Sequence, residues 1–188
     1  MPTFRTSRPV SAADAAIPHV VLVGLPGSGK TTVGRALAEA LGRTFLDFDA
    51  EIERRAGVTI AEIFAASGEA HFRTLERTLT EELSGAGGFV LAPGGGWAVN
   101  PGCVGLLKPP ATLFYLQVEP ARAFKRMADG AESRPLLRRA DPTAELTKIL
   151  REREAAYLLA DHTVRVDFLR ESEVVAAIVA LAGKVGPD

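Results

Sequence analysis

The sequence predicts an α/β fold in which a parallel β-sheet is covered by helices on both faces. Short apolar runs rich in β-prone residues recur at wide spacing, and the stretches between them are long enough for helices. A chain of 188 residues that is 47% hydrophobic can bury one sizeable core. The five expected strands are His19–Val23, Thr44–Phe48, Phe89–Ala92, Thr112–Val118 and His162–Val166.

The first expected strand leads into a phosphate-binding loop (P-loop), Gly24–Thr32, with the sequence GLPGSGKTT. The run Thr32–Leu41 that follows is expected to be a helix. Glycines let backbone N–H groups curl around a phosphate chain, and the N-terminus of the helix adds partial positive charge. Lys30 can reach the β- and γ-phosphates, and the Thr31 hydroxyl can ligate Mg²⁺. The pattern therefore predicts that the chain binds a nucleoside triphosphate.

Two carboxylates, Asp47 and Asp49, close the second expected strand. Ligands of open parallel sheets lie beyond the carboxyl ends of the strands, and residues two apart in an extended chain point to one side. One carboxylate can hold Mg²⁺, directly or through water, while the other accepts a proton from an attacking hydroxyl. The alternative is that one of them only caps the following helix, Ala50–Ala56.

Two helix boundaries and one ion pair are expected in the next segment. Gly57 is expected to end a helix, and the capping box Thr59-Ile60-Ala61-Glu62 to begin another. Arg73 and Glu76 are three residues apart and so share one face of a helix. Glu76 can hold the guanidinium in one rotamer for an anionic ligand. The alternative is an exposed ion pair worth under about 1 kcal/mol.

Glycine and proline mark the boundaries of the third and fourth expected strands. The turn Gly85–Gly88 precedes the third strand, and Gly94–Gly96 follows it, where missing side chains let a ligand pack against backbone. A flexible turn is the alternative for Gly94–Gly96. Pro109-Pro110 precedes the fourth strand, and Glu119-Pro120 begins the helix after it.

Residues 129–142 are expected to form a lid because they break the periodicity and carry Arg134 beside Pro135. Phosphoryl transfer needs positive charge on the γ-phosphate, and a closing loop excludes water as a competing acceptor. Arg151 and Arg153 follow on a charged helix, whose default interpretation is a solvent-exposed face with intrahelical ion pairs.

Composition excludes several classes of protein. With a net charge of −1, no bulk basic field draws the chain to nucleic acid or to a membrane. The single Cys103 cannot form an intrachain disulfide, and no Cys/His cluster suggests zinc. No apolar run approaches the roughly 20 residues that span a bilayer. Residues 1–18 lack the apolar core of a signal peptide, so we expect a flexible N-terminal extension and a cytoplasmic location.

Taken together, the motifs resemble those of the shikimate kinase family over nearly the whole chain, from about Val20 to about Leu181. The resemblance implies a P-loop NTPase fold of three αβα layers with a five-stranded parallel sheet in the order 2-3-1-4-5, as in nucleoside monophosphate kinases. It also implies a single kinase domain over residues 19–188, with a lid, acting as a monomer. The motifs that carry the resemblance are the GxxGxGKT loop, the DxD of Asp47 and Asp49, the GExxFRxxE of Gly68–Glu76, the triple glycine, the RPLL of Arg134–Leu137 and the Arg153-x-x-x-Tyr157 pattern.

The resemblance also implies roles for individual residues. Asp49 would polarise the substrate hydroxyl and serve as base, and Glu76 would orient Arg73. The implied catalytic residues are Lys30, Asp49 and Arg134. The implied ATP contacts are Gly27, Ser28, Gly29, Lys30, Thr31, Thr32, Arg126 and Arg134. The implied substrate contacts are Asp49, Arg73, Gly94, Gly95, Gly96 and Arg153, in which the arginines clamp a carboxylate, and the implied Mg²⁺ ligands are Thr31 and Asp47.

The chain departs from the family's pattern at two places. Trp97 follows the triple glycine, where the family usually has a pair such as Ala-Val, and we expect the indole to pack on the adjacent helix rather than alter the pocket. Ala155 stands where the family often has proline, which leaves a choice between Arg151 and Arg153 for the substrate. The spacing to Tyr157 favours Arg153.

The activity that the resemblance implies is ATP-dependent phosphorylation of the 3-hydroxyl of shikimate, with no nucleic acid or membrane partner. A kinase for another small hydroxy acid, such as gluconate, is one alternative, although it needs no GExxFRxxE motif. A non-catalytic nucleotide-binding module is another, but its carboxylates and lid arginine would be idle. A GTPase switch is excluded because Asn100, the only asparagine, is followed by Pro101 and cannot belong to an Asn-Lys-x-Asp guanine reader.

Overall fold

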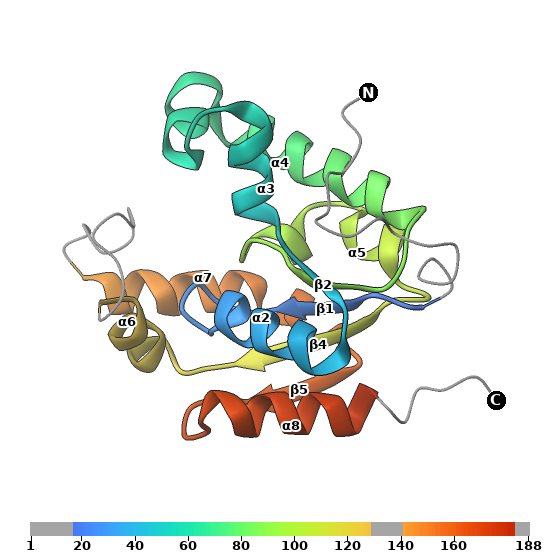
Figure 1. Ribbon diagram of the computed structural model, residues 1–188. Coiled ribbons are helices and arrows are strands. Elements are labelled where there is room, and N and C mark those ends of the chain that lie inside the picture. The colour runs from blue at the N-terminus through green and yellow to red at the C-terminus, as the bar shows by residue number, and fades with distance from the viewer. Residues whose placement is uncertain (1–16, 129–140, 183–188) are drawn as a thin grey trace.

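The computed structural model describes residues 17–128 and 141–182 (Figure 1). The described residues do not include residues 129–140 of the expected lid, which contain Arg134. They also do not include residues 1–16 of the expected extension. Within the described part, no helix is both long enough and apolar enough to pass through a bilayer.

A five-stranded sheet in the order β2-β3-β1-β4-β5 forms the centre of the molecule, as predicted. All neighbouring strands run parallel. Each strand lies within one residue of its expected position at either end. Every residue of β1 and β3 is buried, as expected for parallel strands that helices cover on both faces. The strands are β1 (Val20–Val23), β2 (Thr44–Asp47), β3 (Phe89–Ala92), β4 (Thr112–Gln117) and β5 (His162–Arg165).

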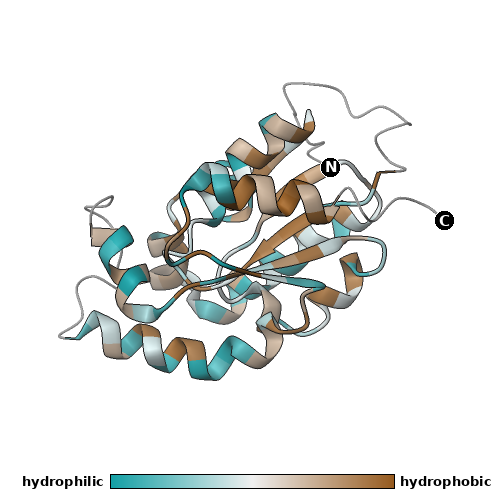
Figure 2. Ribbon diagram, turned by 90° about the horizontal axis from the view of Figure 1, so that it is seen from below, coloured by the Kyte–Doolittle hydropathy of each residue, from teal (hydrophilic) through white to brown (hydrophobic). Residues whose placement is uncertain are grey.

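Helices lie on both sides of this largely apolar sheet, giving three αβα layers (Figure 2). Helix α2 packs against α8, α6 against α7, and α4 against α5. Helix α3 and the first part of α4 project away from the sheet (Figure 1). The helices are α2 (Lys30–Leu41), α3 (Phe48–Ala56), α4 (Ile60–Ser84), α5 (Cys103–Leu107), α6 (Pro120–Ala128), α7 (Pro142–Tyr157) and α8 (Glu171–Ala182), with a 3₁₀ turn, η1, at Trp97–Val99.

The caps of α3 and α4 form as the sequence predicts, with one shift. Gly57 ends α3 in the left-handed region, at φ 70°. Thr59 and Glu62 form the capping box: the Glu62 amide donates to the Thr59 hydroxyl at 3.2 Å, and the Thr59 amide to the Glu62 carboxylate at 2.7 Å. Helix α3 begins two residues earlier than expected, at Phe48, because the Asp47 side chain caps it.

The projecting helix α4 is kinked, and its second half packs into the core. Gly68 interrupts the helical backbone with φ 75° and ψ 175°, a conformation that glycine adopts without strain. Beyond the kink, the fully buried indole of Trp97 donates a hydrogen bond to the Thr80 hydroxyl at 2.9 Å. The expectation that Trp97 packs on the adjacent helix is therefore confirmed.

Candidate functional site

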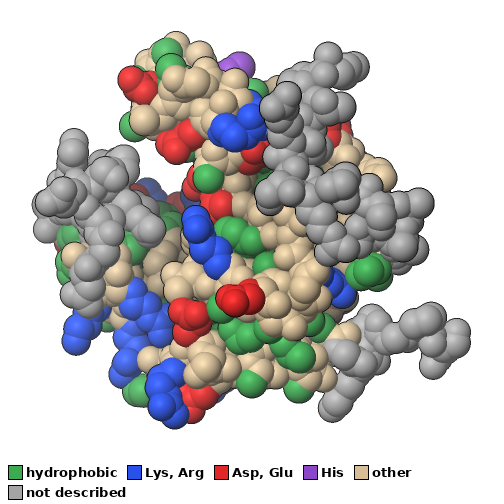
Figure 3. Space-filling view, in the orientation of Figure 1, with side chains coloured by type: hydrophobic (Ala, Val, Ile, Leu, Met, Phe, Trp, Pro, Cys, Tyr) green, Lys and Arg blue, Asp and Glu red, His purple; other side chains and the backbone are tan. Residues whose placement is uncertain are grey.

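A cleft of about 1290 Å³ opens at the carboxyl ends of the strands. In Figure 3 the surface is hollowed below the projecting α3 and α4, with acidic and basic side chains beside the hollow. Of the predicted site residues, the cleft is lined by Gly27, Ser28, Gly29, Lys30, Thr31, Thr32, Asp47, Asp49, Gly94, Gly95 and Arg126. Arg73, Gly96 and Arg153 are not among the residues that line it.

The P-loop forms one end of the cleft and is shaped by its glycines. Gly27 has φ 81°, and a Cβ there would collide with the Ala123 carbonyl oxygen of α6. Gly29, at φ 96°, precedes the first residue of α2, so the N-terminus of this helix faces the cleft. The Lys30 ammonium donates to the carbonyl oxygens of Gly24 and Leu25, each at 2.9 Å. The backbone N–H groups of the P-loop, the N-terminus of α2 and the Lys30 ammonium together provide a concave site for an anion.

Next to the P-loop, Asp47 makes two kinds of contact at once. One carboxylate oxygen accepts hydrogen bonds from the amides of Asp49 and Ala50 at 3.1 and 3.3 Å and so caps α3. The other accepts from the Thr31 hydroxyl at 2.7 Å. The capping role and a role beside a metal are therefore compatible for this residue.

The oxygen atoms of Thr31 and Asp47 are of the hard type that Mg²⁺ prefers. Among the residues that the structure describes, no group of three or more His, Cys, Asp or Glu side chains forms a metal cage. Mg²⁺ in nucleotide sites usually takes one or two protein oxygens and completes its octahedron with phosphate oxygens and water. The residues present fit that mode of binding.

Two carboxylates from different helices converge where Gly94 has no side chain. A Cβ at Gly94 would lie 3.0 Å from an oxygen of Asp49 on α3 and 3.0 Å from an oxygen of Glu76 on α4. Loss of solvation beside the protein raises the pKa of Asp49, and the nearby Asp47 raises it further, while Lys30 and Arg73 oppose the shift. Asp49 is nevertheless an exposed residue, so solvent screening weakens these effects. Asp49 therefore lies within electrostatic reach of both the P-loop lysine and Arg73.

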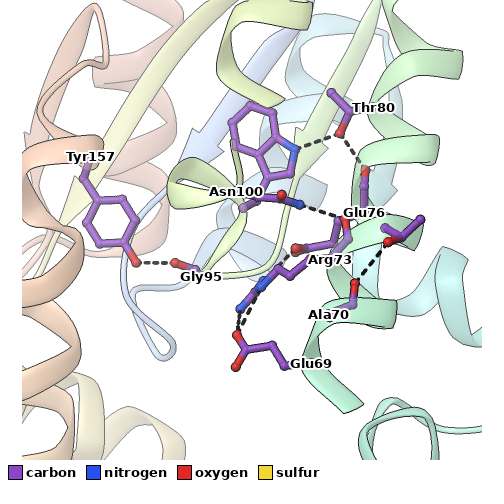
Figure 4. Close-up of polar contacts among 10 residues, drawn as sticks. Glu69, Ala70, Arg73, Glu76, Thr80, Gly95, Asn100 and Tyr157 are labelled. Atoms are coloured by element: carbon purple, nitrogen blue, oxygen red, sulfur yellow. Dashed lines mark hydrogen bonds and ion pairs between the residues drawn. The ribbon is translucent and has the colours of Figure 1, made fainter. Parts of the chain in front are cut away.

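Behind Gly94, Arg73 is held between two glutamates of its own helix (Figure 4). Its Nη1 donates to Glu76 at 2.6 Å, and its Nη2 donates to Glu69 at 2.7 Å. Glu76 is fully buried, and burial raises its pKa while the Arg73 charge opposes the shift. The exposed ion pair considered for Arg73 and Glu76 is therefore wrong: Glu76 is buried and Arg73 is half-buried.

The other side of Arg73 packs against the glycine segment. A Cβ at Gly96 would collide with the guanidinium, so any larger residue there would force Arg73 to move. The Asn100 side chain donates to the Arg73 carbonyl oxygen at 2.8 Å. Sequence reasoning missed Asn100 and Glu69 as supports of Arg73. Glu69 could have been found from its position four residues before Arg73 on one helix.

At the far side of the glycine segment, Tyr157 and Arg153 reach in from α7. The Tyr157 hydroxyl donates to the Gly95 carbonyl oxygen at 2.5 Å (Figure 4). Burial raises the pKa of Tyr157, and the nearby charge of Arg153 opposes the shift. Arg151 is exposed, whereas Arg153 is half-buried. The structure therefore places Arg153, not Arg151, beside this part of the site.

One side of the cleft, next to the P-loop, combines Arg126 with apolar side chains. The Arg126 guanidinium donates to the carbonyl oxygens of Ser28 and Val166. Met127, Val166, Leu169 and Val174 supply the apolar lining around it. Such a surface, next to a P-loop, suits the flat face of a nucleotide base.

The sequence profile of the shikimate kinase family matches residues 26–182. The chain belongs to the shikimate kinase family. This membership places it among ATP-dependent kinases. A shikimate kinase from Pelotomaculum thermopropionicum is 40% identical over 161 residues, which cover 86% of this chain and 93% of that protein.

Solved structures agree with the family assignment. A shikimate kinase from Acinetobacter baumannii, solved in complex with shikimate, matches with a TM-score of 0.83 and 37% identity over 93% of this chain and 98% of that chain. A gluconokinase from Sinorhizobium meliloti matches with a TM-score of 0.59 and 18% identity over 89% of this chain and 93% of that chain. The second likeness shows a shared fold alone.

Proposed function

We propose that the protein transfers the γ-phosphate of ATP to the 3-hydroxyl of shikimate and so forms shikimate 3-phosphate. One observation carries the proposal: the Asp49 carboxylate converges with that of Glu76, the partner of Arg73, at Gly94, and the charges of both Lys30 and Arg73 act on it. A phosphate donor and a carboxylate-bearing acceptor would thus meet at a base. Family membership and the shikimate complex of a 37% identical relative support the same substrate.

In the proposed reaction, the P-loop amides and Lys30 bind the phosphates of ATP and stabilise the negative charge of the transferring group. Asp49 accepts a hydrogen bond from the acceptor hydroxyl and aims its oxygen at the γ-phosphate. It takes the proton as the new P–O bond forms and the bond from the γ-phosphorus to the departing ADP breaks. The P-loop thereby supplies the electrostatics and Asp49 supplies the acid–base step.

Arg73 and Arg153 would bind the acceptor carboxylate. Each hydrogen bond to a charged group is worth about 1.5–3 kcal/mol, so two arginines can supply most of the selectivity over uncharged polyols. Gly94–Gly96 would lie against the ring, and the lack of side chains at Gly94 and Gly96 leaves room for Asp49, Glu76 and Arg73 beside it. Glu76 would keep Arg73 in one rotamer.

We further propose that Thr31 and Asp47 hold Mg²⁺, with water between the metal and Asp47. Mg²⁺ held there would neutralise the charge that develops on the phosphates. Arg134 remains a prediction from the sequence: we propose that it meets the transferring phosphoryl group from a lid at 129–142 of a single kinase domain. We also propose a cytoplasmic monomer that acts on small molecules, and the net charge of −1 supports the lack of a nucleic acid partner.

The test is release of ADP from ATP with and without an acceptor, using shikimate, quinate and gluconate in parallel. We expect shikimate to stimulate ADP release strongly and gluconate to leave it at the basal rate. Stimulation by gluconate alone would reassign the protein to sugar-acid phosphorylation. Basal turnover with every acceptor would leave only a nucleotide-binding module.

A further inference from the structure

Tyr157 connects two parts of the acceptor end that are distant in sequence. It is the last residue of α7, and its side chain is almost completely buried. Its hydroxyl proton is used in the 2.5 Å hydrogen bond to the Gly95 carbonyl oxygen, 62 residues away. The charge of the Arg153 guanidinium also acts on this hydroxyl. A phenol has one proton and free lone pairs, so its oxygen can accept from a guanidinium while its proton is donated to Gly95.

The peptide that Tyr157 contacts is wedged against the P-loop. A Cβ at Gly95 would lie 3.0 Å from the ring of Pro26 and 3.4 Å from the Gly24 carbonyl oxygen. The neighbouring glycines contact Asp49 and Glu76 on one side and Arg73 on the other. A change in the position of the Gly95 peptide would therefore change the distance between the acceptor pocket and the phosphate end.

We propose that Tyr157 is a positioning residue for the acceptor carboxylate, because its hydroxyl fixes the Gly95 peptide and the Arg153 guanidinium in one mutual arrangement. The inference rests on the proposed function, since it assumes that the acceptor carries a carboxylate. Without the hydroxyl, the guanidinium would lose a partner and sample other rotamers. Arg73, whose charge also acts on the Tyr157 hydroxyl, would then bind the carboxylate without a fixed second arginine.

The chain contains a matched control for the loss of one buried hydroxyl. The Tyr115 ring on β4 stacks on the Tyr157 ring, with centroids 5.3 Å apart and planes at 32°. Among the described residues, nothing hydrogen-bonds to the buried Tyr115 hydroxyl. Tyr115→Phe therefore removes the same atom from the same ring stack without breaking a polar contact.

The experiment compares Tyr157→Phe and Tyr115→Phe with the wild type, using shikimate and its neutral methyl ester as acceptors. For Tyr157→Phe we expect the KM for shikimate to rise about ten-fold, which corresponds to about 1.4 kcal/mol. We expect kcat and the KM for ATP to change less than about two-fold. The preference for the acid over the ester should fall by a similar factor. Tyr115→Phe should leave all of these values unchanged.

Any of three results would overturn the inference. The first is a KM for shikimate that stays at the wild-type value in Tyr157→Phe. The second is an equal rise in KM for shikimate and its methyl ester, and the third is the same effect in Tyr115→Phe. Arg153→Ala gives an independent measurement: if Tyr157 acts through Arg153, Tyr157→Phe adds less than about two-fold in the Arg153→Ala background, and a full ten-fold addition contradicts it. A wild-type protein that shikimate does not stimulate would refute the proposed function itself, and this inference with it.

Discussion

The two ends of the cleft are built differently. The phosphate end is formed by consecutive residues, Gly24–Thr32, and by one side chain from the next strand, Asp47. The acceptor end gathers α3, α4, the segment after β3, and α7, so its contacts join residues far apart in sequence. Backbone N–H groups dominate the first end, and side-chain ion pairs and hydrogen bonds dominate the second.

The two ends therefore have different roles. The phosphate end binds a ligand that many proteins share, and the acceptor end selects among acceptors. A P-loop depends on local backbone geometry, so it is shared by many proteins and carries little information about the acceptor. The acceptor end depends on buried charge, which is costly unless it is paired, and it therefore tolerates few changes. Substitutions at the phosphate end should lower the rate with all acceptors, whereas those at the acceptor end should change the preference among acceptors.

Lys30→Ala is expected to have the largest effect and should break the phosphate end alone. Loss of one group that stabilises transition-state charge lowers kcat by about 10²- to 10³-fold. The ratio of kcat/KM for shikimate to that for its methyl ester should stay within about two-fold of the wild-type ratio. Steady-state kinetics with both acceptors measure this. A selective loss of the acid would show that the two ends are not independent.

Arg73→Lys should break the acceptor end with the next largest effect. Lysine keeps the charge beside Glu76 but cannot offer two parallel N–H donors, so we expect the KM for shikimate to rise about 10- to 100-fold. The KM for ATP should stay near its wild-type value. Arg77→Lys is the control, because Arg77 lies one turn further along the same helix in an exposed pair with Glu81. Equal weakening of ATP and shikimate would argue against a carboxylate clamp.

Local features of both ends could be predicted from sequence, and long-range ones could not. The P-loop, the capping box and the shared face of Arg73 and Glu76 follow from residues at most a few positions apart. The burial of Glu76 follows from the packing of α4 on the segment after β3, which no local pattern encodes. The contact between Tyr157 and Gly95 depends on how α7 returns to the sheet.

Because long-range packing cannot be predicted from local sequence, two interpretations of site residues differ between the sequence and the structure. Arg73 and Glu76 were compatible with an exposed pair because a helix face has no known partner until the fold is known. For Asp47 the alternatives are a helix cap and a metal support, and its cap uses one oxygen and leaves the other beside Thr31, so the cap does not exclude the metal role. The position of α7 likewise favours Arg153 over Arg151, since the charge of Arg153 acts on Tyr157.

Glu76→Gln also changes the acceptor end, and we expect a smaller effect on the KM for shikimate than that of Arg73→Lys. Glutamine keeps the shape but removes the charge that holds the Arg73 guanidinium, so we expect the KM for shikimate to rise about five-fold. Because Arg73 would keep its exposed pair with Glu69, and because burial already disfavours the ionised form of Glu76 and raises its pKa, the neutral side chain should cost little stability. Glu81→Gln, in the exposed pair, should change neither value. Kinetics and thermal unfolding of both variants test this, and a large fall in Tm for Glu76→Gln would contradict it.

The smallest expected effect concerns a change at His19, which lies at the amino ends of the strands, opposite the cleft. Its ring nitrogens contact the Leu83 carbonyl oxygen at 3.0 Å and the Phe89 amide at 3.3 Å. Burial lowers the pKa of His19 below its ordinary value of 6.5. The unfolded state therefore binds more protons between the folded-state pKa and about 6.5, so stability should fall as the pH drops below about 6.5, by at most about 1.4 kcal/mol per pH unit.

The variant His19→Gln cannot titrate in this range, so its stability should depend less on pH between about 5 and 6.5 than that of the wild type. The preference for shikimate over its methyl ester should be the same in both proteins at each pH, because His19 lies outside both ends of the cleft. Denaturant unfolding and parallel kinetics across this range measure the two quantities. Identical pH dependence of stability in both proteins would assign the acid sensitivity to another group. A change in acceptor preference would show that the packing at the amino ends of the strands reaches the acceptor end, and the division of the molecule into independent regions would then fail.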